Sequence, residues 1–354
     1  MKRICLYILS ALVLASCGRS ECSSHRDDNT KSSIAFKKDI ILPTTPVKDQ
    51  GTTDLCWIYA MLATIETDRL AQGDSVNLSP LWLARKSLEE QATTTYLKGT
   101  EISLRGTLPE AMRLLDTYGI VAWDAYHGNS GVASRAEARR IDRMARMFSN
   151  NNRGLESLQE TVGGSLDDSL GPTPRNVFMF GMEYTPPEFA RSLCLPGDWM
   201  AYTSFTHHPF HRPFAVEVPD NRQGHEAMNV PIGELLAMTA ESLKNGHPVA
   251  WEGCMAFMDD GKDKRKSFAE NKKGSWNVTP NDTASLQKKR QRLFESHRLT
   301  DDHAMAIVGM GHTKDGQRLF ILKNSWGEDF GNKGFAVMTE RQFALCTIMI
   351  MLRK

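Results

Sequence analysis

Residues 46–57 read Pro46-Val47-Lys48-Asp49-Gln50-Gly51-Thr52-Thr53-Asp54-Leu55-Cys56-Trp57, and this segment leads into an apolar run. From Cys56 to about Ala71, apolar residues fall on most faces of a helix rather than on one stripe, which predicts a largely buried helix. Cys56 opens this helix, where the positive end of the helix dipole favours a thiolate. A lone cysteine is ordinarily a small buried hydrophobe, so a catalytic role for Cys56 depends on partners elsewhere in the chain.

Two later segments contain candidate partners. They are a predicted strand, Asp302-His303-Ala304-Met305-Ala306-Ile307-Val308-Gly309, and a predicted turn, Lys323-Asn324-Ser325-Trp326-Gly327. Acyl transfer by a thiol needs a nucleophile, a histidine that moves the proton, a group that orients the histidine, and donors for the oxyanion. Residue types suited to each of these tasks are present in the three segments together.

In order and local spacing, the three segments resemble the active-site segments of the papain-like cysteine peptidases. The resemblance implies that Cys56 is the nucleophile, His303 its base, Asn324 the residue that orients the base, and Gln50 a side-chain donor to the oxyanion. It also implies that Trp326 shields the hydrogen bond between the histidine and the asparagine, and that no cofactor is needed. Each residue alone fits a structural role, but the combination favours catalysis.

Two segments in the middle of the chain resemble the branch of this family that contains bleomycin hydrolase and bacterial aminopeptidase C. They read Tyr184-Thr185-Pro186-Pro187-Glu188-Phe189 and Asn245-Gly246-His247-Pro248-Val249-Ala250-Trp251-Glu252-Gly253-Cys254. In that branch a C-terminal arm restricts cleavage to free N-termini, whereas this sequence ends at Lys354, directly after the last predicted strand. The resemblance therefore leaves open whether the chain is an aminopeptidase or an endopeptidase.

The segment Ser103-Leu104-Arg105-Gly106 stands where the family has its substrate-binding pair of glycines. The resemblance implies that the backbone at Gly106 pairs with extended substrate, while Arg105 replaces the first glycine and either alters the groove or brings a charge to it. A solvated arginine in an ordinary loop is an equally good interpretation of Arg105. Asp302 and Trp326, beside the predicted base and its orienting residue, complete the predicted substrate-binding set.

The succession of predicted elements indicates an α+β fold. Helices dominate residues 50–245; they are Cys56–Ala71, one opened by Ser79-Pro80, Thr107–Tyr118, Ala133–Asn151 and Pro231–Lys244. Strands dominate residues 246–354; they are Pro248–Cys254, Ala304–Gly309, Arg318–Lys323, Gly334–Met338 and Thr347–Leu352. A polar, charge-rich insertion at about 259–298 interrupts the strands. Together with the resemblance, this pattern predicts a two-lobed papain-like domain at 34–354, with a helical lobe and an antiparallel, β-barrel-like lobe.

The N-terminus has the features of a secretory signal. A basic start precedes an apolar run from Ile4 to Ala15. The stretch Leu14-Ala15-Ser16-Cys17 resembles a bacterial lipobox, which implies a signal peptide at 1–16 and a lipid on Cys17. Residues 17–33 are polar and lack apolar periodicity, as a tether would. We therefore expect an exported chain, lipid-anchored at the bacterial cell envelope; a plain cleaved signal is the alternative.

Composition and spacing weigh against several other functions. A formal net charge of +1 gives no overall field to hold nucleic acid, and the basic runs near 262–266 and 288–292 are interspersed with acidic and polar residues, as in a solvated surface. The histidines at 207, 208 and 211 lack further ligands in sequence, so no metal site is predicted. Apart from the two in the signal and the lipobox, the cysteines are far apart with no CxxC pair, which favours neither zinc nor a dense disulfide framework.

We expect an active thiol peptidase whose partner is a peptide or protein substrate. Two alternatives stay open at this stage. A catalytically silent papain-fold module would bind peptides without cutting them, with Asp54, Leu55 and Arg105 deforming the cleft. An acyltransferase would pass the same thioester to an amine rather than to water, and nothing in the sequence separates that reaction from hydrolysis.

Overall fold

The computed structural model describes residues 36–128, 133–255 and 280–354. All of them belong to the compact unit Ser33–Lys354. The predicted signal peptide, lipobox cysteine and tether lie outside the described residues, and so does the first part of the predicted insertion. Within the described ranges, none of the helices has the length and apolar character that crossing a bilayer requires.

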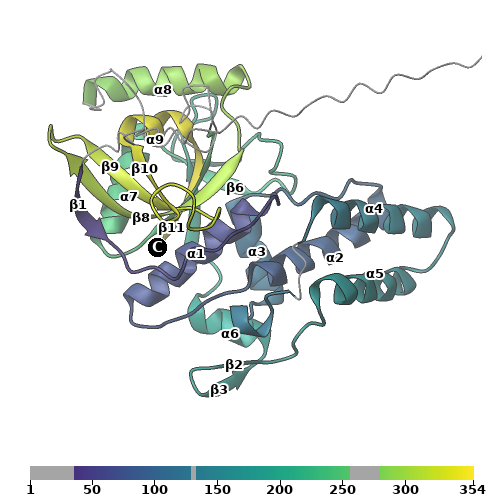
Figure 1. Ribbon diagram of the computed structural model, residues 1–354. Helices are drawn as coiled ribbons and strands as arrows, with labels where there is room; N and C mark the ends of the chain where they lie inside the picture. Colours follow the sequence, from purple (N-terminus) through teal and green to yellow (C-terminus); the bar gives the residue numbers. More distant parts are fainter. Residues whose placement is uncertain (1–35, 129–132, 256–279) are drawn as a thin grey trace, which may run out of the picture. The chain divides into compact units, whose positions relative to one another are not determined.

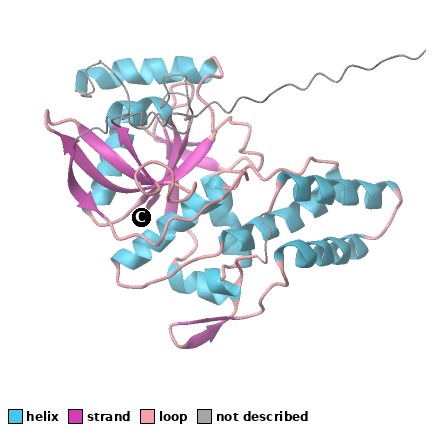
Figure 2. Cartoon of the chain, viewed as in Figure 1, coloured by secondary structure: helices cyan, strands magenta, loops and turns pink. Residues whose placement is uncertain are grey.

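Helices and strands are mixed, which confirms the predicted α+β class (Figure 2). The helices in the described ranges are α1 (Cys56–Ala71), α2 (Pro80–Lys98), α3 (Leu108–Tyr118), the 3₁₀ turn η1 (Trp123–Ala125), α4 (Arg135–Asn150), α5 (Leu155–Leu170), α6 (Pro186–Leu193), α7 (Ile232–Lys244), α8 (Pro280–Glu295) and α9 (Glu340–Cys346).

One large sheet holds most of the strands. The strands are β1 (Phe36–Ile41), β2 (Val177–Met179), β3 (Met182–Tyr184), β4 (Trp199–Thr203), β5 (Pro213–Ala215), β6 (Glu226–Asn229), β7 (Val249–Gly253), β8 (His303–Thr313), β9 (Arg318–Lys323), β10 (Phe335–Thr339) and β11 (Thr347–Arg353). In the described residues the large sheet runs β10-β9-β8-β7-β11-β4-β6-β5, with β1 added on β8, while β2 and β3 form a separate hairpin. Its pairs are antiparallel except for β4 with β6, so the sheet is mixed.

Helices α2, α4 and α5 pack together on one side of the unit, and the sheet lies on the other side with α1 between them (Figure 1).

Two features of the fold differ from the sequence prediction. Strands β4 to β6 fall inside the range predicted to be mainly helical, and they join the sheet. Residues Pro280–Glu295, predicted to be part of a polar insertion, form α8, whose Leu286 and Leu293 are buried.

Local signals explain where several helices begin and end. Ser79 caps α2, because its hydroxyl accepts a 3.2 Å hydrogen bond from the backbone N–H of Trp82. Thr185 and Glu188 form a capping box at the start of α6. Helix α3 ends at Gly119, whose φ of 71° suits glycine, and a Cβ there would lie 2.1 Å from the backbone of Pro186. The close contact between α3 and α6 therefore requires glycine.

Helix α1 is the central element of the core, as its apolar faces predict. Ile58, Met61 and Leu62 are almost fully buried. So are Glu66 and Asp68, two acidic residues of α1 whose carboxylates have hydrogen-bond partners. Oε1 of Glu66 accepts hydrogen bonds from Lys48 Nζ at 2.6 Å and from the backbone N–H of Leu78 at 2.7 Å. These bonds fix the helix that begins with Cys56 against the segments that precede and follow it in the chain.

One basic residue differs from its predicted setting. Arg290 lies on α8 in a run predicted to be solvated, yet its side chain is completely buried. Its Nε donates to the carbonyl of Ser204 at 2.6 Å, its Nη1 donates to the carbonyl of Ala344 at 3.2 Å, and the guanidinium lies over the ring of Phe205. Backbone carbonyls and an aromatic face thus stabilise a cation that the sequence pattern places in water.

Candidate active site

Cys56 is the first residue of α1, and the preceding residue gives it no side-chain cap. Leu55 accepts the backbone N–H groups of Ile58 and Tyr59 through its carbonyl, but no side-chain oxygen caps this end of the helix. The Cys56 thiol is free and partly buried. A helix that starts without a side-chain cap leaves its first backbone N–H groups available to a bound group, which suits an oxyanion hole.

His303 and Asn324 meet because they stand at the same end of two antiparallel strands. His303 begins β8, Asn324 directly follows β9, and the two strands pair through Ala306 and Lys323. Nε2 of His303 lies 2.8 Å from Oδ1 of Asn324. Because an amide oxygen only accepts, Nε2 carries the hydrogen in the neutral ring and Nδ1 is left as the proton acceptor. The ring of Trp326 stacks on His303 with centroids 4.4 Å apart.

Gln50 is held by the segment that carries Asn324. Its backbone N–H donates to the carbonyl of Ser325 at 2.8 Å, and its Oε1 accepts from the Ser325 hydroxyl at 2.6 Å. Its Nε2 donates to the carbonyl of Thr53 at 2.7 Å. A primary amide has two N–H donors, so one of them is left after the bond to Thr53. Gln50 is thus oriented with a donor available beside Cys56.

A cavity of about 240 Å³ collects most of the predicted residues. Three predicted catalytic residues line it, namely Gln50, Cys56 and His303, together with the four predicted substrate-binding residues Arg105, Gly106, Asp302 and Trp326. Asn324 does not line the cavity but contacts the histidine from behind. Cys17, the predicted lipidation residue, lies outside the described residues. The structure therefore brings together every predicted site residue that it describes.

Burial disfavours charge on the thiol and on the imidazole alike. It raises the pKa of the Cys56 thiol to about 12, an effect to which the carboxylate of Glu252 adds; the backbone N–H of Ala304 and the charge of Arg105 oppose it. Burial also lowers the pKa of His303 to about 4, against the hydrogen bond that the ring donates to Asn324. Neither group ionises alone at neutral pH, so a thiolate–imidazolium pair would form only if each new charge stabilises the other.

Backbone N–H groups favour a thiolate at Cys56, but their effect on its pKa is smaller than the effect of burial. The backbone N–H of Trp57, at the start of α1, lowers the pKa of Cys56, yet this is the smallest of the named contributions. The backbone N–H groups at the helix terminus therefore do not by themselves yield a thiolate here.

Trp57 positions the loop that carries Arg105 and Gly106. Its Nε1 donates to the carbonyl of Leu104 at 2.8 Å. A Cβ on Gly106 would lie 2.9 Å from Cε2 and Cζ2 of the Trp57 ring, closer than real Cβ contacts come. The glycine at this position allows the loop backbone to lie directly on the tryptophan that follows the candidate nucleophile.

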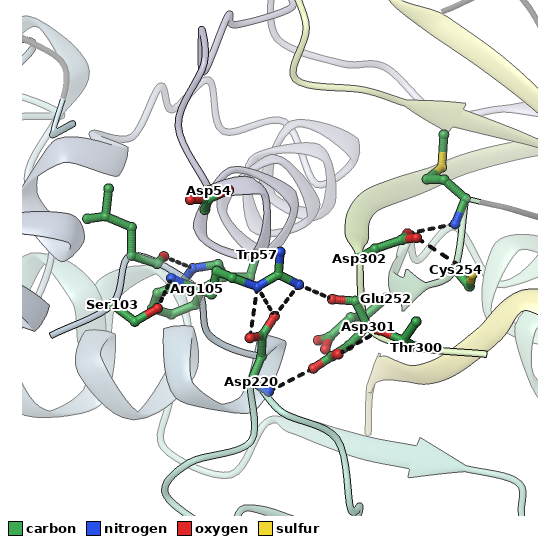
Figure 3. Close-up of polar contacts among 12 residues, drawn as sticks. Asp54, Trp57, Ser103, Arg105, Asp220, Glu252, Cys254, Thr300, Asp301 and Asp302 are labelled. Atoms are coloured by element: carbon green, nitrogen blue, oxygen red, sulfur yellow. Dashed lines mark hydrogen bonds and ion pairs between the residues drawn. The ribbon is translucent and has the colours of Figure 1, made fainter. Parts of the chain in front are cut away.

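Three buried acidic residues at this cavity were not predicted as site residues. Asp220, Glu252 and Asp301 line it, and Figure 3 shows them grouped around the side chain of Arg105. Arg105 Nε donates to both oxygens of Asp220, at 2.9 and 2.8 Å, and its Nη2 donates to the backbone carbonyl of Asp301 at 2.8 Å. Arg105 is therefore an ion-paired residue of the cavity wall rather than a solvated loop residue.

The sequence holds a signal for only one of these acids. Glu252 interrupts the apolar run of a predicted strand, and a carboxylate in such a run indicates a buried polar group with a structural or functional role. Asp220 and Asp301 stand in loops, where aspartate is ordinary. The predicted substrate-binding residue Asp302 differs from both, because its carboxylate is directed away from Arg105 and accepts a 2.6 Å hydrogen bond from the backbone N–H of Met255 (Figure 3).

His207, His208 and Glu217 form the cluster within the described residues whose ligand atoms lie within 4.8 Å of one another. Nε2 of His207 lies 3.0 Å from Glu217, and Nδ1 of the same ring lies 3.0 Å from Nε2 of Gln291. Oε1 of Gln291 accepts from the backbone N–H of Thr206, so Nε2 of Gln291 is the donor and Nδ1 of His207 the acceptor. The hydrogen of His207 then sits on Nε2, where a metal would need a lone pair, so the cluster fits a hydrogen-bonded pair better than a metal site.

Comparisons with known proteins agree with this geometry. The sequence profile of the Peptidase C1-like family matches residues 180–354. Bleomycin hydrolase of Gallus gallus is 29% identical over 183 residues, which cover 48% of this chain and 37% of that protein. Aminopeptidase G of Lactobacillus delbrueckii subsp. lactis is 23% identical over 356 residues, covering 85% of this chain and 79% of that protein.

A solved structure shares the fold. The crystal structure of PepW from Lactobacillus rhamnosis superposes with a TM-score of 0.68 and covers 91% of this chain and 82% of its own, at 18% sequence identity. At that identity the likeness concerns the fold alone. The α+β fold of this chain therefore has a counterpart among solved structures.

Proposed function

We propose that this chain, a papain-like cysteine peptidase near the bleomycin hydrolase and aminopeptidase C branch, hydrolyses peptide bonds through a thioester on Cys56. The observation that supports this most strongly is the 2.8 Å contact between His303 Nε2 and Asn324 Oδ1 at a cavity that Cys56 also lines. That contact leaves Nδ1 of His303 as a base on the cavity side of the ring.

In the proposed reaction, the Cys56 sulfur attacks the scissile carbonyl carbon while its proton passes to Nδ1 of His303. The oxyanion that forms accepts hydrogen bonds from the second N–H of Gln50 and from the backbone N–H of Cys56. Collapse of this intermediate breaks the C–N bond, and His303 gives its proton to the leaving amine. Water, deprotonated by His303, then attacks the thioester and releases the acid and the thiol.

A covalent probe tests the nucleophile. Purified chain is incubated under reducing conditions with an epoxysuccinyl thiol-peptidase inhibitor, and the adduct is mapped by mass spectrometry. We expect one adduct, on Cys56, and a Cys56→Ser variant without it. Cys346 is the matched control, because it is also free but fully buried, and a Cys346→Ser variant keeps the adduct. An unmodified Cys56 in folded protein would contradict the proposal.

The cleavage mode and the fate of the thioester are decided by products. A peptide library with free and acetylated N-termini is digested and sequenced by mass spectrometry. Cleavage of free N-termini alone identifies an aminopeptidase, and cleavage within acetylated peptides identifies an endopeptidase. Ligated products in the presence of added amines identify an acyltransferase, while peptide binding without any product identifies a silent binding module.

We further propose that the chain is exported and held at the bacterial cell envelope by a lipid on Cys17. The support is the apolar run from Ile4 to Ala15, followed at once by Ser16 and Cys17. Metabolic labelling with a fatty acid is expected to mark the native chain and not a Cys17→Ser variant. Labelling of both chains, or of neither, would exclude Cys17 as the lipid attachment site.

A further inference from the structure

One wall of the cavity carries an excess of carboxyl groups. We call Asp220, Glu252 and Asp301 the acidic wall. Asp54 also lines the cavity, but its charge is offset by Arg135, whose guanidinium donates two 2.6 Å hydrogen bonds to the carboxylate. The acidic wall has Arg105 as its neighbouring cation, and that guanidinium pairs with both oxygens of Asp220. Three carboxyl groups therefore face one positive charge.

Glu252 has an oxygen without a partner. Its side chain is almost fully buried, at 2% exposure, and Oε2 accepts a 2.9 Å hydrogen bond from the backbone N–H of Leu108. In the described part of the chain, nothing bonds to Oε1. A buried carboxyl oxygen that is left unsatisfied is rare and destabilising, and here it belongs to a residue that lines the cavity beside Cys56. A group with N–H donors and a positive charge is its complement.

We propose that the acidic wall is a subsite that binds a positively charged nitrogen of the substrate, close to the bond that is cut. This inference rests on the proposed peptidase function and adds the substrate class to it. Two sources provide that chemistry: the free α-amino group of a peptide, or the side chain of a lysine or arginine. Both offer several N–H donors to Glu252 and a charge to offset Asp301.

The ionisation of the wall agrees with this role. Burial raises the pKa of Glu252 well above its usual range, with Asp301 and Asp220 adding to the effect. Burial and Asp220 raise the pKa of Asp301 to about 7, and Arg105 opposes them. An approaching cation reverses these shifts, so its binding releases protons and strengthens as pH rises from about 5 to about 8.

Binding and turnover are measured on one peptide scaffold in three forms. The first is acetylated and contains lysine, the second is acetylated with norleucine in place of lysine, and the third is the norleucine peptide with a free N-terminus. In the two acetylated forms, the lysine or norleucine is placed either directly before the scissile bond or one residue earlier. Affinity is measured by calorimetry on the full chain with Cys56→Ala, and kcat/KM on the native chain.

We expect a charged form to bind on the order of tenfold more tightly than the acetylated norleucine form at pH 8, with a smaller ratio at pH 5. Preference for the first form assigns the site to basic side chains, and preference for the third assigns it to the α-amino group. Equal affinity of all three forms would overturn the inference. If the charged forms bind preferentially and no peptide is cut, the subsite stands and the proposed hydrolysis falls.

Variants of the acidic wall show which residues cause the preference for charged peptides. Glu252→Gln keeps the shape and the acceptor for Leu108, and we expect it to lower the charged-to-uncharged affinity ratio by about threefold to tenfold. Asp301→Asn is a second variant with the same expectation. Glu340→Gln is the control, because Glu340, on α9 outside the cavity, is also a largely buried carboxyl but pairs with Arg318 of β9. An unchanged ratio in both folded wall variants would remove the acidic wall from recognition.

Discussion

The Ser325 hydroxyl donates a 2.6 Å hydrogen bond to Oε1 of Gln50, while the Ser325 backbone N–H donates a 2.7 Å bond to Oδ1 of Asn324. One residue thus contacts both side-chain amides that the proposed mechanism uses. Because the hydroxyl occupies the oxygen of Gln50, the nitrogen of that amide is directed to the carbonyl of Thr53 and to the cavity. Ser325 is therefore a positioning residue for the oxyanion donor.

Ser325→Ala removes this orientation and leaves the thiol and the imidazole in place. Loss of a whole oxyanion donor lowers kcat by about 10² to 10³, so misorientation of the donor is expected to lower kcat by about tenfold, with little change in KM. Alkylation of Cys56 by iodoacetamide involves no oxyanion and is expected to keep its native rate. A parallel loss of alkylation would show that Ser325 acts on the thiol, and Gln50→Ala provides the larger reference effect.

The parts of the site that the sequence predicts are those encoded in short segments. Helix α1 is predicted from apolar residues on most faces of one helix, and β9 is predicted with its observed bounds, Arg318–Lys323, from a compact apolar run. The family resemblance relates these segments to one another. Position in the chain and local pattern are sufficient for such features, because neither depends on a distant partner.

The features that the sequence does not predict depend on tertiary contacts. The sequence pattern does not predict helix α5, because Gly163 and Gly164 weaken its helical signal. Leu158, Val162 and Leu166 are nevertheless buried on one face of this helix. The three strands β4 to β6 are only three to five residues long and gain their hydrogen bonds from the sheet. The acidic wall joins residues 220, 252 and 301, and no local pattern relates three positions so far apart.

The dependence of Cys56 on His303 is tested by alkylation. Burial holds the pKa of the thiol at about 12 unless the imidazole accepts its proton. His303→Ala is therefore expected to lower the rate of reaction of Cys56 with iodoacetamide at pH 7 by at least about a hundredfold. His207→Ala, on the surface beside Glu217, is the control and keeps the native rate. A folded His303→Ala protein that is alkylated at the native rate would mean that the helix terminus alone activates the thiol.

The acidic wall predicts a pH-dependent stability. Asp301 has a pKa near 7 in the folded chain, against about 3.9 in unfolded chains, because burial and Asp220 oppose its charge while Arg105 favours it. The folded state binds the extra proton, so the stability contributed by that proton is complete below about pH 4 and is lost as pH rises through 7.

Asp301→Asn removes that titration. We expect the variant to unfold at a higher temperature than the native chain at pH 8, and the difference between the two proteins to shrink or reverse at pH 5. Thermal unfolding by circular dichroism at both pH values measures this. The same difference at both pH values would show that Asp301 keeps an ordinary pKa in the folded chain.

The contact between Gly106 and Trp57 predicts the last effect. A Cβ at Gly106 would lie 2.9 Å from two ring atoms of Trp57, and the ring has little room to move because it is 2% exposed and bonded to the carbonyl of Leu104. Gly106→Ala is therefore expected to lower the free energy of unfolding by about 1–3 kcal/mol and to lower kcat/KM by at least about tenfold, since the displaced loop carries Arg105 and the displaced ring follows Cys56.

Gly164→Ala is the matched control: it lies in α5 with nothing within 4 Å of a new Cβ, and there alanine is expected to raise stability by up to about 1 kcal/mol without changing activity. If Gly106→Ala matches Gly164→Ala in thermal unfolding and in kcat/KM, the loop does not depend on its close approach to the tryptophan, and the cavity wall tolerates more movement than this contact implies.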